Sequence, residues 1–368
     1  MMESAATPVE KSLLDLAQQL DSDNIIGYLR NTVHDLKRGF SAVSADRFPW
    51  LSLLKKGSWS GVLCLGMGGS AAGGDFLSTL SAHQGHCPIV VHRDYQLPAW
   101  FDATWLVLAT SHSGNTEETV MAAQTALKRG ATVIVIASGG EIAGLPEIYP
   151  RCFLLPCIGG QPPRTAFGHI FSLQLSCLEF LGLVPSVSPD SRLAMLERLQ
   201  TTNEALDILH SPEGDIALLA TSLVNRGIAV IGPTEMSPAL TRFKNQMNEN
   251  AARFVRIAIL PEMNHNESVA WGGIGADQDE TSSDQGLMIL TWQGMHPRVK
   301  QRLNWMVAHA TTETAWNVIA EGESLLEALL YQCLVMDWLS VALALLHGKN
   351  PSSIAPITAL KEHLESVQ

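Results

Sequence analysis

Three hydroxyl side chains lie within six residues of one another in the segment Thr110-Ser-His-Ser-Gly-Asn-Thr-Glu-Glu118. Ser111, Ser113 and Thr116 surround Gly114, after an apolar run and before a helix-like stretch. Hydroxyls and free amides at a helix start form an anion site that the helix dipole favours. A single hydroxyl is enough to cap a helix together with a following glutamate. Three of them favour recognition of a phosphate.

A second loop with the same potential is Gly66-Met-Gly-Gly-Ser-Ala-Ala-Gly73. Its phosphate-binding candidates are Gly68, Gly69 and Ser70. The loop also fits Gly-x-Gly-x-x-Ala, the dinucleotide fingerprint, with Asp94 near the position of a ribose-binding acid. A third interpretation is a tight strand-to-helix turn that needs glycine for steric reasons. The glycine-rich loop alone does not decide among the three.

Glu249 is the candidate general base, in Phe243-Lys-Asn-Gln-Met-Asn-Glu-Asn-Ala-Ala252. Leu240, Phe243 and Met247 mark the apolar stripe of a predicted helix, and Glu249 falls about 200° from Met247 on the other face. A solvated glutamate on an amphipathic helix fits the same pattern. The three neighbouring asparagines argue against a plain surface helix, because asparagine is a poor helix former.

Three further side chains have the chemistry of a proton-transfer site. Arg164 lies in the rigid turn Gln161-Pro-Pro-Arg-Thr-Ala-Phe-Gly-His169, where its guanidinium would face an oxyanion or, equally, solvent. His265 follows the predicted strand Phe254–Leu260, and open α/β sheets bind ligands at the carboxyl ends of their strands. Lys361 lies on a short amphipathic helix near the C-terminus, which by itself indicates an exposed lysine.

The elements that must position these residues alternate along the chain. Apolar runs without alternation predict parallel strands buried on both faces, and helix-like stretches such as Glu117–Arg129 follow them. The predicted strands are Val62–Leu65, Pro88–Val91, Trp105–Ala109, Thr132–Ala137, Cys152–Leu155, Gly227–Ile231, Phe254–Leu260 and Leu287–Trp292. This alternation predicts an α/β fold with doubly wound parallel sheets and helices on both faces.

The strands form two sets that look like weak copies of each other. The segment starting at Gly61 can be laid on that starting at Gly227, and Trp105–Ser111 resembles Gly286–Trp292. The polar stretch Gly272–Gln285 is the predicted insertion, and the Pro- and Gly-containing passages 158–164 and 184–190 are boundary signals. The predicted organisation is an N-terminal helical segment (1–45), a first domain (46–183), a linker helix (184–212), a second domain (213–348) and a C-terminal tail helix (349–368).

Composition narrows the class of protein. The 368 residues are 46% hydrophobic and 16% charged, which excludes a disordered chain. A net charge of −12 and the absence of a basic run disfavour a nucleic-acid partner. The six cysteines mostly lie in apolar runs and are predicted to be reduced and buried. No signal peptide is evident, and the apolar stretch Ala328–Leu346 contains Asp337, so we expect a cytoplasmic protein with no membrane span.

The loop Ser-His-Ser-Gly-Asn-Thr-Glu-Glu resembles the Ser-x-Ser-Gly-Asn-Thr signature of the sugar isomerase (SIS) domain, and Gly68-Gly69-Ser70 is similar to its partner loop. Pro-Arg-x-Ala-Phe-Gly, Asn-Glu-Asn-Ala, Asn-His-Asn-Glu and the lysine near the chain end extend this resemblance to the bifunctional phosphoglucose/phosphomannose isomerase family. The resemblance runs from Gly61 to the C-terminus and implies two tandem SIS domains. It departs from the family pattern at His112, which replaces an aromatic residue, and in the second domain, which lacks the signature loop. One phosphate site per chain is therefore implied.

The resemblance also implies roles for the residues. Glu249 would move a proton between C1 and C2 of a sugar phosphate, and Arg164 would stabilise the cis-enediolate. His265, contributed by the partner subunit of a homodimer, would assist ring opening, and Lys361 would help to position the substrate. Thr358 is the threonine nearest to that lysine, and such a threonine is linked in the family with accepting both epimers. The implied reaction interconverts fructose 6-phosphate with glucose 6-phosphate and mannose 6-phosphate and needs no cofactor.

Other functions fit parts of the pattern. Another SIS phosphosugar isomerase would not need Glu249 and His265 at this spacing, and a non-catalytic sugar-phosphate sensor would keep only the loop hydroxyls. A dinucleotide-dependent dehydrogenase would not need the Ser-Gly-Asn-Thr loop. No His-x-His or His-Glu-x-x-His spacing occurs, which disfavours a zinc-dependent mannose phosphate isomerase.

Overall fold

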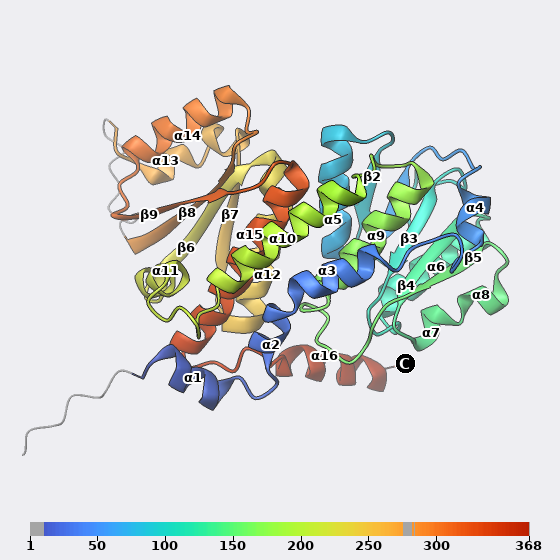
Figure 1. The fold of residues 1–368 in the computed structure, drawn as a ribbon, viewed down its shortest axis with the longest axis horizontal. Coiled ribbons are helices and arrows are strands. Elements are labelled where there is room, and N and C mark those ends of the chain that lie inside the picture. Colours follow the sequence, from blue (N-terminus) through green and yellow to red (C-terminus); the bar gives the residue numbers. More distant parts are fainter. Residues whose placement is uncertain (1–10, 275–281, 283, 368) are drawn as a thin grey trace, which may run out of the picture.

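Two parallel β-sheets lie side by side in the computed structural model, which describes residues 11–274, 282 and 284–367 (Figure 1). The first sheet has the order β2-β1-β3-β4-β5 and the second β7-β6-β8-β9. The strands of the first sheet are β1 (Val62–Leu65), β2 (Ile89–His92), β3 (Leu106–Thr110), β4 (Thr132–Ala137) and β5 (Cys152–Pro156). Those of the second are β6 (Gly227–Pro233), β7 (Val255–Leu260), β8 (Gln285–Trp292) and β9 (Thr314–Ala320).

The strand orders confirm the predicted duplication. β1 and β6, which contain the two segments that we laid on each other, are the second strands of their sheets, and β3 and β8 are the third. β9 then corresponds to β4, and β5 has no counterpart among the strands of the described residues. In the predicted insertion, residues 275–281 and 283 lie outside the described part of the chain.

Helices cover both faces of the first sheet, as a doubly wound fold requires. Successive strand residues point to opposite faces: Val62 and Leu106 belong to one hydrophobic core with Phe171, whereas Leu63 belongs to another with Ala123. The helices of the N-terminal segment and this domain are α1 (Leu13–Leu20), α2 (Ile25–Arg30), α3 (Thr32–Phe40), α4 (Trp50–Leu54), α5 (Gly68–Gln84), α6 (Glu117–Lys128), α7 (Gly140–Ala143), α8 (Leu145–Ile148) and α9 (Phe167–Leu181).

The longest helix of the second half is the apolar stretch considered above as a membrane span. Of the most hydrophobic window of α15, 89% is buried inside the protein, against α10, α11 and α12. It is a core helix, as expected. The elements of this half are α10 (Pro189–Ala205), α11 (Asp215–Leu223), η1 (Thr234–Met236), α12 (Ser237–Gln246), η2 (Met247–Ala251), η3 (Glu262–His265), α13 (Ser268–Trp271), α14 (Pro297–His309), α15 (Leu325–Leu346) and α16 (Ala355–Ser366).

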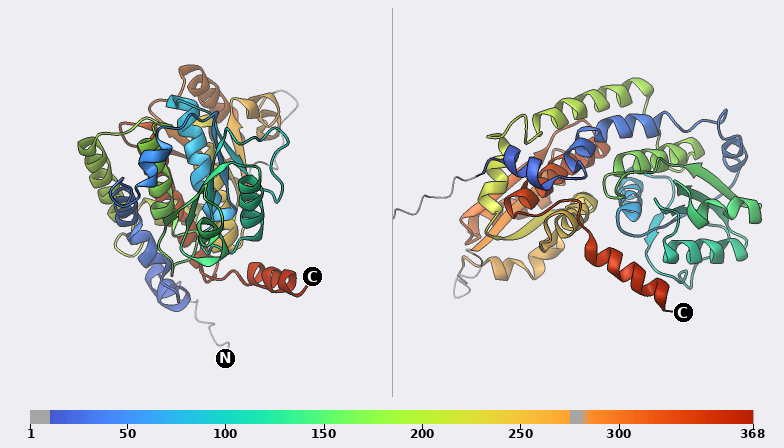
Figure 2. Two further views of the ribbon diagram at one scale, coloured as in Figure 1. Left: turned by 90° about the vertical axis from the view of Figure 1, so that its right-hand side faces the viewer. Right: turned by 90° about the horizontal axis from the view of Figure 1, so that it is seen from below.

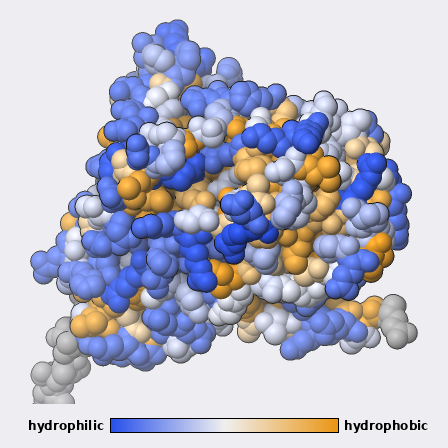
Figure 3. Space-filling view, turned by 45° about the vertical axis from the view of Figure 1, so that its right-hand side comes forward, coloured by the Kyte–Doolittle hydropathy of each residue, from blue (hydrophilic) through white to orange (hydrophobic). Residues whose placement is uncertain are grey.

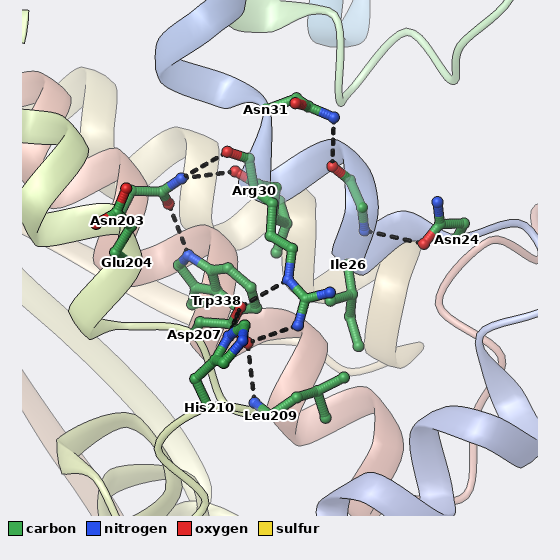
Figure 4. A network of polar contacts seen from close by, with 12 residues as sticks. Asn24, Ile26, Arg30, Asn31, Asn203, Glu204, Asp207, Leu209, His210 and Trp338 are labelled. Carbon is green, nitrogen blue, oxygen red and sulfur yellow. Dashed lines mark hydrogen bonds and ion pairs between the residues drawn. The ribbon is translucent and has the colours of Figure 1, made fainter.

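The N-terminal helices attach to both halves of the molecule. α3 packs on α9 of the first domain, and α1 and α2 pack on α15. Arg30 donates to both carboxylate oxygens of Asp207, at 2.6 and 3.2 Å (Figure 4). Asn203 on α10 donates to the carbonyls of Leu29 and Arg30 and accepts from Trp338 Nε1. The segment therefore fixes the relative position of the two sheets.

The C-terminal helix α16 extends away from the body below the two domains, as Figure 2 shows from two further directions. None of its residues is buried. The chain before it is held in place, because Pro351 is buried and its carbonyl accepts a hydrogen bond from Arg164.

The cysteines follow the expectation closely. All six are free, five are buried and Cys87 is half-buried. Burial raises the pKa of Cys64, Cys152 and Cys177 to about 12, so their thiols stay protonated at neutral pH.

Candidate active site

Two of the predicted catalytic residues meet at the boundary between the domains. Arg164 follows β5 of the first domain, Glu249 lies beyond α12 of the second, and 3.3 Å separates Arg164 Nη1 from Glu249 Oε2. The arginine side chain is 3% exposed and the glutamate 26%. An almost fully buried cation thus contacts a carboxylate that solvent and a ligand can reach, which is the arrangement expected of an oxyanion stabiliser beside a base.

The guanidinium of Arg164 is held on three sides. Nε donates to Asn250 Oδ1 at 2.8 Å, and Nη2 donates to the carbonyl of Pro351 at 2.7 Å, while Nη1 faces Glu249. Burial lowers the pKa of Arg164, and the Glu249 carboxylate opposes that shift. The group stays protonated, because arginine does not lose its proton in proteins. Its positive charge is therefore fixed in place and direction.

A π-helical turn places Glu249. The helix changes from α to π geometry at Met247 and ends at Ala251, and the next residue, Ala252, has a positive φ of 50°. Such turns are rare and often occur at functional sites. Met247 is fully buried, whereas Glu249 lines a cleft of about 600 Å³ together with Gly68 of the first domain. The prediction that these two side chains lie on different faces is confirmed.

The two predicted phosphate loops also lie next to each other. Ser70 Oγ accepts a hydrogen bond of 3.1 Å from the backbone N–H of His112. A Cβ atom on Gly69 would come within 3.1 Å of the Pro163 carbonyl oxygen and 3.3 Å of Arg164 Cα. Glycine at this position therefore lets the start of α5 approach the turn that carries the arginine.

Within the signature loop the hydroxyls have different tasks. Ser111 is fully buried, and its Oγ accepts from the N–H of Gly114 at 3.1 Å and donates to Thr116 Oγ1 at 2.9 Å. Gly114 has a φ of 79°, a conformation that glycine adopts without strain. Ser113 is exposed and Thr116 half-exposed. The geometry makes Ser111 the residue that shapes the loop and leaves Ser113 and Thr116 accessible to a ligand.

His112 connects this loop to its surroundings. Its ring Nε2 lies 3.0 Å from the Ile158 carbonyl, and its own carbonyl accepts from Ser138 Oγ at 2.7 Å. Burial lowers the pKa of the imidazole, which keeps it neutral at neutral pH. The histidine fills a buried position in the loop, where the family pattern has an aromatic residue.

Comparison with known proteins extends what the geometry shows. Residues 214–364 match the family model described as "Bacterial phospho-glucose isomerase C-terminal SIS domain". The bifunctional phosphoglucose/phosphomannose isomerase of Aquifex aeolicus is 29% identical over 328 residues, covering 87% of this chain and 95% of that protein. The enzymes of the same name from Caldicellulosiruptor bescii and Thermoplasma acidophilum are each 28% identical, covering 83% and 84% of this chain and 90% and 91% of those proteins.

The chain is thus similar over most of its length to bifunctional phosphoglucose/phosphomannose isomerases, and its C-terminal part matches a phosphoglucose isomerase domain. Solved structures support the fold of this isomerase. A putative phosphosugar isomerase from Clostridium difficile has a TM-score of 0.68 at 17% identity and covers 89% of this chain and 95% of that one. The C-terminal domain of glucosamine-fructose-6-phosphate aminotransferase from Francisella tularensis has a TM-score of 0.68 at 11% identity, covering 95% and 99%.

The structure does not bring His265 to the Arg164–Glu249 pair of the isomerase. His265 is exposed, at the end of η3. Glu249 precedes β7 and His265 follows it, and a six-residue strand spans about 20 Å. The two residues thus lie at opposite ends of the second sheet of one chain.

Lys361 and Thr358 lie on α16 and are both exposed. Among the hydrogen bonds and ion pairs of the described residues, none joins Lys361 to Arg164 or Glu249. The segment that leads to α16 nevertheless passes the site, because the Pro351 carbonyl binds Arg164.

Several residues that line the cleft of the isomerase escaped the prediction. They follow one another at helical spacing along α12 and into the π turn η2, and are Thr241, Lys244, Asn245 and Asn248. Arg93 and Asp75 line the same cleft and form an ion pair of 2.5 Å. The signal was present in the sequence, because polar residues recur at i, i+3, i+4 and i+7 and continue to Glu249.

Proposed function

We propose that this enzyme interconverts fructose 6-phosphate with glucose 6-phosphate and mannose 6-phosphate through a cis-enediolate. The observation that carries the proposal is the contact between Arg164 Nη1 and Glu249 Oε2 in a cleft that also contains Gly68. A cleft of about 600 Å³ is of the size that binds small molecules. The names of the relatives agree with this activity.

In the proposed mechanism, each domain contributes different residues to substrate binding and proton transfer. The starts of α5 and α6 would hold the phosphate at C6, through backbone amides, Ser70, Ser113 and Thr116. The Glu249 carboxylate would remove the proton from C1 of open-chain fructose 6-phosphate, which leaves the negative charge of the enediolate on O2. The proton would then return to C2 while a proton passes from the C1 hydroxyl to O2, so that C1 becomes the aldehyde. Arg164 would stabilise the negative charge that develops on O2.

Ring opening needs an acid and a base near the ring oxygen, and we assign these roles to His265 and Lys361. Because His265 lies at the far end of β7 from Glu249, it would act in the site of a partner subunit, which makes the working form a homodimer. One face of the molecule carries a hydrophobic area bordered by hydrophilic residues (Figure 3), and surfaces of this kind are typical of subunit contacts. We also propose a cytoplasmic location, which agrees with the six free cysteines.

A coupled assay with fructose 6-phosphate tests the proposal, with glucose 6-phosphate and mannose 6-phosphate followed separately. The wild-type protein is expected to form both products, and Glu249→Gln to form neither at more than about a thousandth of the wild-type rate. A protein that binds fructose 6-phosphate and forms neither product would instead be a sugar-phosphate sensor. Normal turnover by the Gln variant would remove Glu249 from the mechanism.

A further inference from the structure

A closed ring of buried hydrogen bonds surrounds Arg164. Its members beyond the arginine are Asn250, Ser340, Asp337 and Arg242, and their exposed fractions range from 0 to 5%. Arg242 Nη2 donates both to Asp337 Oδ2, at 2.5 Å, and to the backbone carbonyl of Arg164, at 3.2 Å. Asp337, which the sequence placed in an otherwise apolar helix, is therefore the buried counter-ion of an arginine that holds the main chain at the site.

The other half of the ring fixes the Arg164 side chain. Ser340 Oγ donates its proton to the Asp337 carbonyl at 2.8 Å, so that it offers a lone pair to Asn250 Nδ2 at 2.9 Å. The amide nitrogen of Asn250 must then face Ser340, and its oxygen faces Arg164 Nε. The orientation of the amide is thus set by α15, on the side away from the cleft.

We propose that Asn250 is a positioning residue for the isomerase reaction. It holds the guanidinium so that Nη1 faces Glu249 and the oxygen of the enediolate. The proposal rests on the function proposed above and adds a residue that does not touch the substrate. A guanidinium is planar, so an acceptor at Nε fixes the direction of both terminal nitrogens. Because Arg242 holds the Arg164 carbonyl separately, loss of Asn250 should leave the backbone in place, while the side chain can turn about its remaining bond to the Pro351 carbonyl.

The main test compares Asn250→Leu with Asn203→Leu. Both asparagines are 2% exposed, and each uses its amide as donor and acceptor, Asn203 with Leu29 and Trp338 (Figure 4). The two variants should lose similar stability, but only Asn250→Leu disturbs Arg164. We expect its kcat to fall about a hundredfold relative to Asn203→Leu, with KM changed less than about threefold. A kcat within about threefold of the Asn203→Leu value would overturn the proposal.

Two further variants separate positioning from general damage. Asn250→Asp keeps an acceptor for Arg164 Nε and should retain kcat within about tenfold of the wild type. Ser340 lies on another helix, and its hydroxyl reaches the Arg164 side chain only through Asn250, so in Ser340→Ala kcat should fall about three- to tenfold with KM unchanged. Equal losses in Asn250→Leu and Asn250→Asp would contradict the positioning role.

Ligand binding by calorimetry keeps this inference distinct from the proposed function. The probes are inorganic phosphate and 5-phosphoarabinonate, whose carboxylate has the planar oxygens and charge of the enediolate. Asn250→Leu should bind 5-phosphoarabinonate at least about tenfold more weakly than Asn203→Leu, with phosphate affinity unchanged. This result would support positioning even if the wild type did not convert fructose 6-phosphate. Equal weakening of both probes, or of neither, would overturn it.

Discussion

The two sheets share their strand order, but the loops after their equivalent strands have opposite chemistry. In the first domain the loops after β1 and β3 are joined by Ser70 Oγ and the His112 amide, and hydroxyls surround the junction. In the second domain η1, which follows β6, is joined to the end of β8, because Trp292 Nε1 donates to Glu235 Oε1 at 2.9 Å. A carboxylate thus stands where an anion would bind in the other copy.

This difference agrees with the expectation of one phosphate site in a duplicated fold. In the proposed mechanism the first copy binds the phosphate with the loops at the carboxyl ends of its strands. The second contributes through the far end of α12, where a π turn carries Glu249 to the domain boundary. In the proposed mechanism the second copy therefore supplies the base and the polar side chains that line the cleft, and no phosphate site.

The largest loss of activity should follow a substitution of Arg164, which lies at the boundary between the two copies. Arg164→Lys keeps a positive charge but cannot reproduce the bonds to Asn250, Glu249 and Pro351. We expect kcat to fall about 10²- to 10³-fold with a small change in KM, measured in steady-state assays. Arg192→Lys is the matched control, a largely buried arginine paired with Glu179 away from the cleft. Similar kcat losses in both variants would show that the boundary has no special role.

The next largest effect is a change in KM, which should differ between substitutions in the loop after β3 and in the loop after β8. Ser113→Ala removes an accessible hydroxyl from the first loop and should raise KM roughly tenfold with kcat retained. Gln293→Ala removes an exposed side chain from the second, one that donates to the Gly322 carbonyl. It should leave KM unchanged. A rise in KM in the second variant alone would move the phosphate site to the second domain.

A smaller effect concerns the helices that hold the two copies together. Burial raises the pKa of Asp207, but hydrogen bonds from Arg30, the Leu209 amide and His210 outweigh this and lower it. A carboxyl group whose pKa is lower in the folded than in the unfolded protein stabilises the fold at pH values above its unfolded pKa of about 4. That stabilisation is lost as the pH falls through the folded pKa.

Asp207→Asn should therefore lower the free energy of unfolding by about 2 kcal/mol at pH 7. Breaking a fully buried ion pair would lower it more, but the Arg30 side chain is 42% exposed. Urea unfolding of wild type and variant at several pH values measures this. The difference should shrink below about pH 4. A difference that stays constant with pH would exclude the charge of Asp207 as its cause.

The smallest effect should be that of salt concentration on KM. The chain carries a net charge of −12, and the proposed phosphate contacts are amides and hydroxyls. Steering by long-range charge should contribute little, so KM for fructose 6-phosphate should change less than about twofold between low and physiological ionic strength. A steep rise of KM with salt would show that capture depends on the cations of the cleft, Arg93 and Lys244.

The strands were predictable where both faces are buried. β1 and β4 coincide with the predicted runs, because a central parallel strand must be apolar throughout. β9 was missed because its residues alternate between exposed and half-buried at the edge of the sheet. The passage 158–164 is only one of the two boundary signals, and the predicted first domain extends to 183. The helix between the two passages, α9, packs on α5 and α3.

Only those site residues that belong to a local sequence motif could be predicted. Glu249, Arg164 and the loop hydroxyls stand out by local context or by family resemblance. Asn250 and Pro351 lie 86 and 187 positions from Arg164, and no local pattern indicates contacts across such distances. Asp337 was visible as a charge in an apolar helix, but its partner Arg242 is 95 positions away. Folding, rather than periodicity, brings these residues together.

Proton exchange with solvent tests most directly whether Glu249, held against Arg164, moves the proton between C1 and C2. Fructose 6-phosphate is incubated with the enzyme in deuterium oxide, and deuterium at C2 of the glucose 6-phosphate formed is measured by NMR after many turnovers. We predict incorporation with the wild type and with Gln293→Ala, and neither turnover nor incorporation with Glu249→Gln. Turnover without deuterium in the wild type, or unchanged incorporation by Glu249→Gln, would contradict the account.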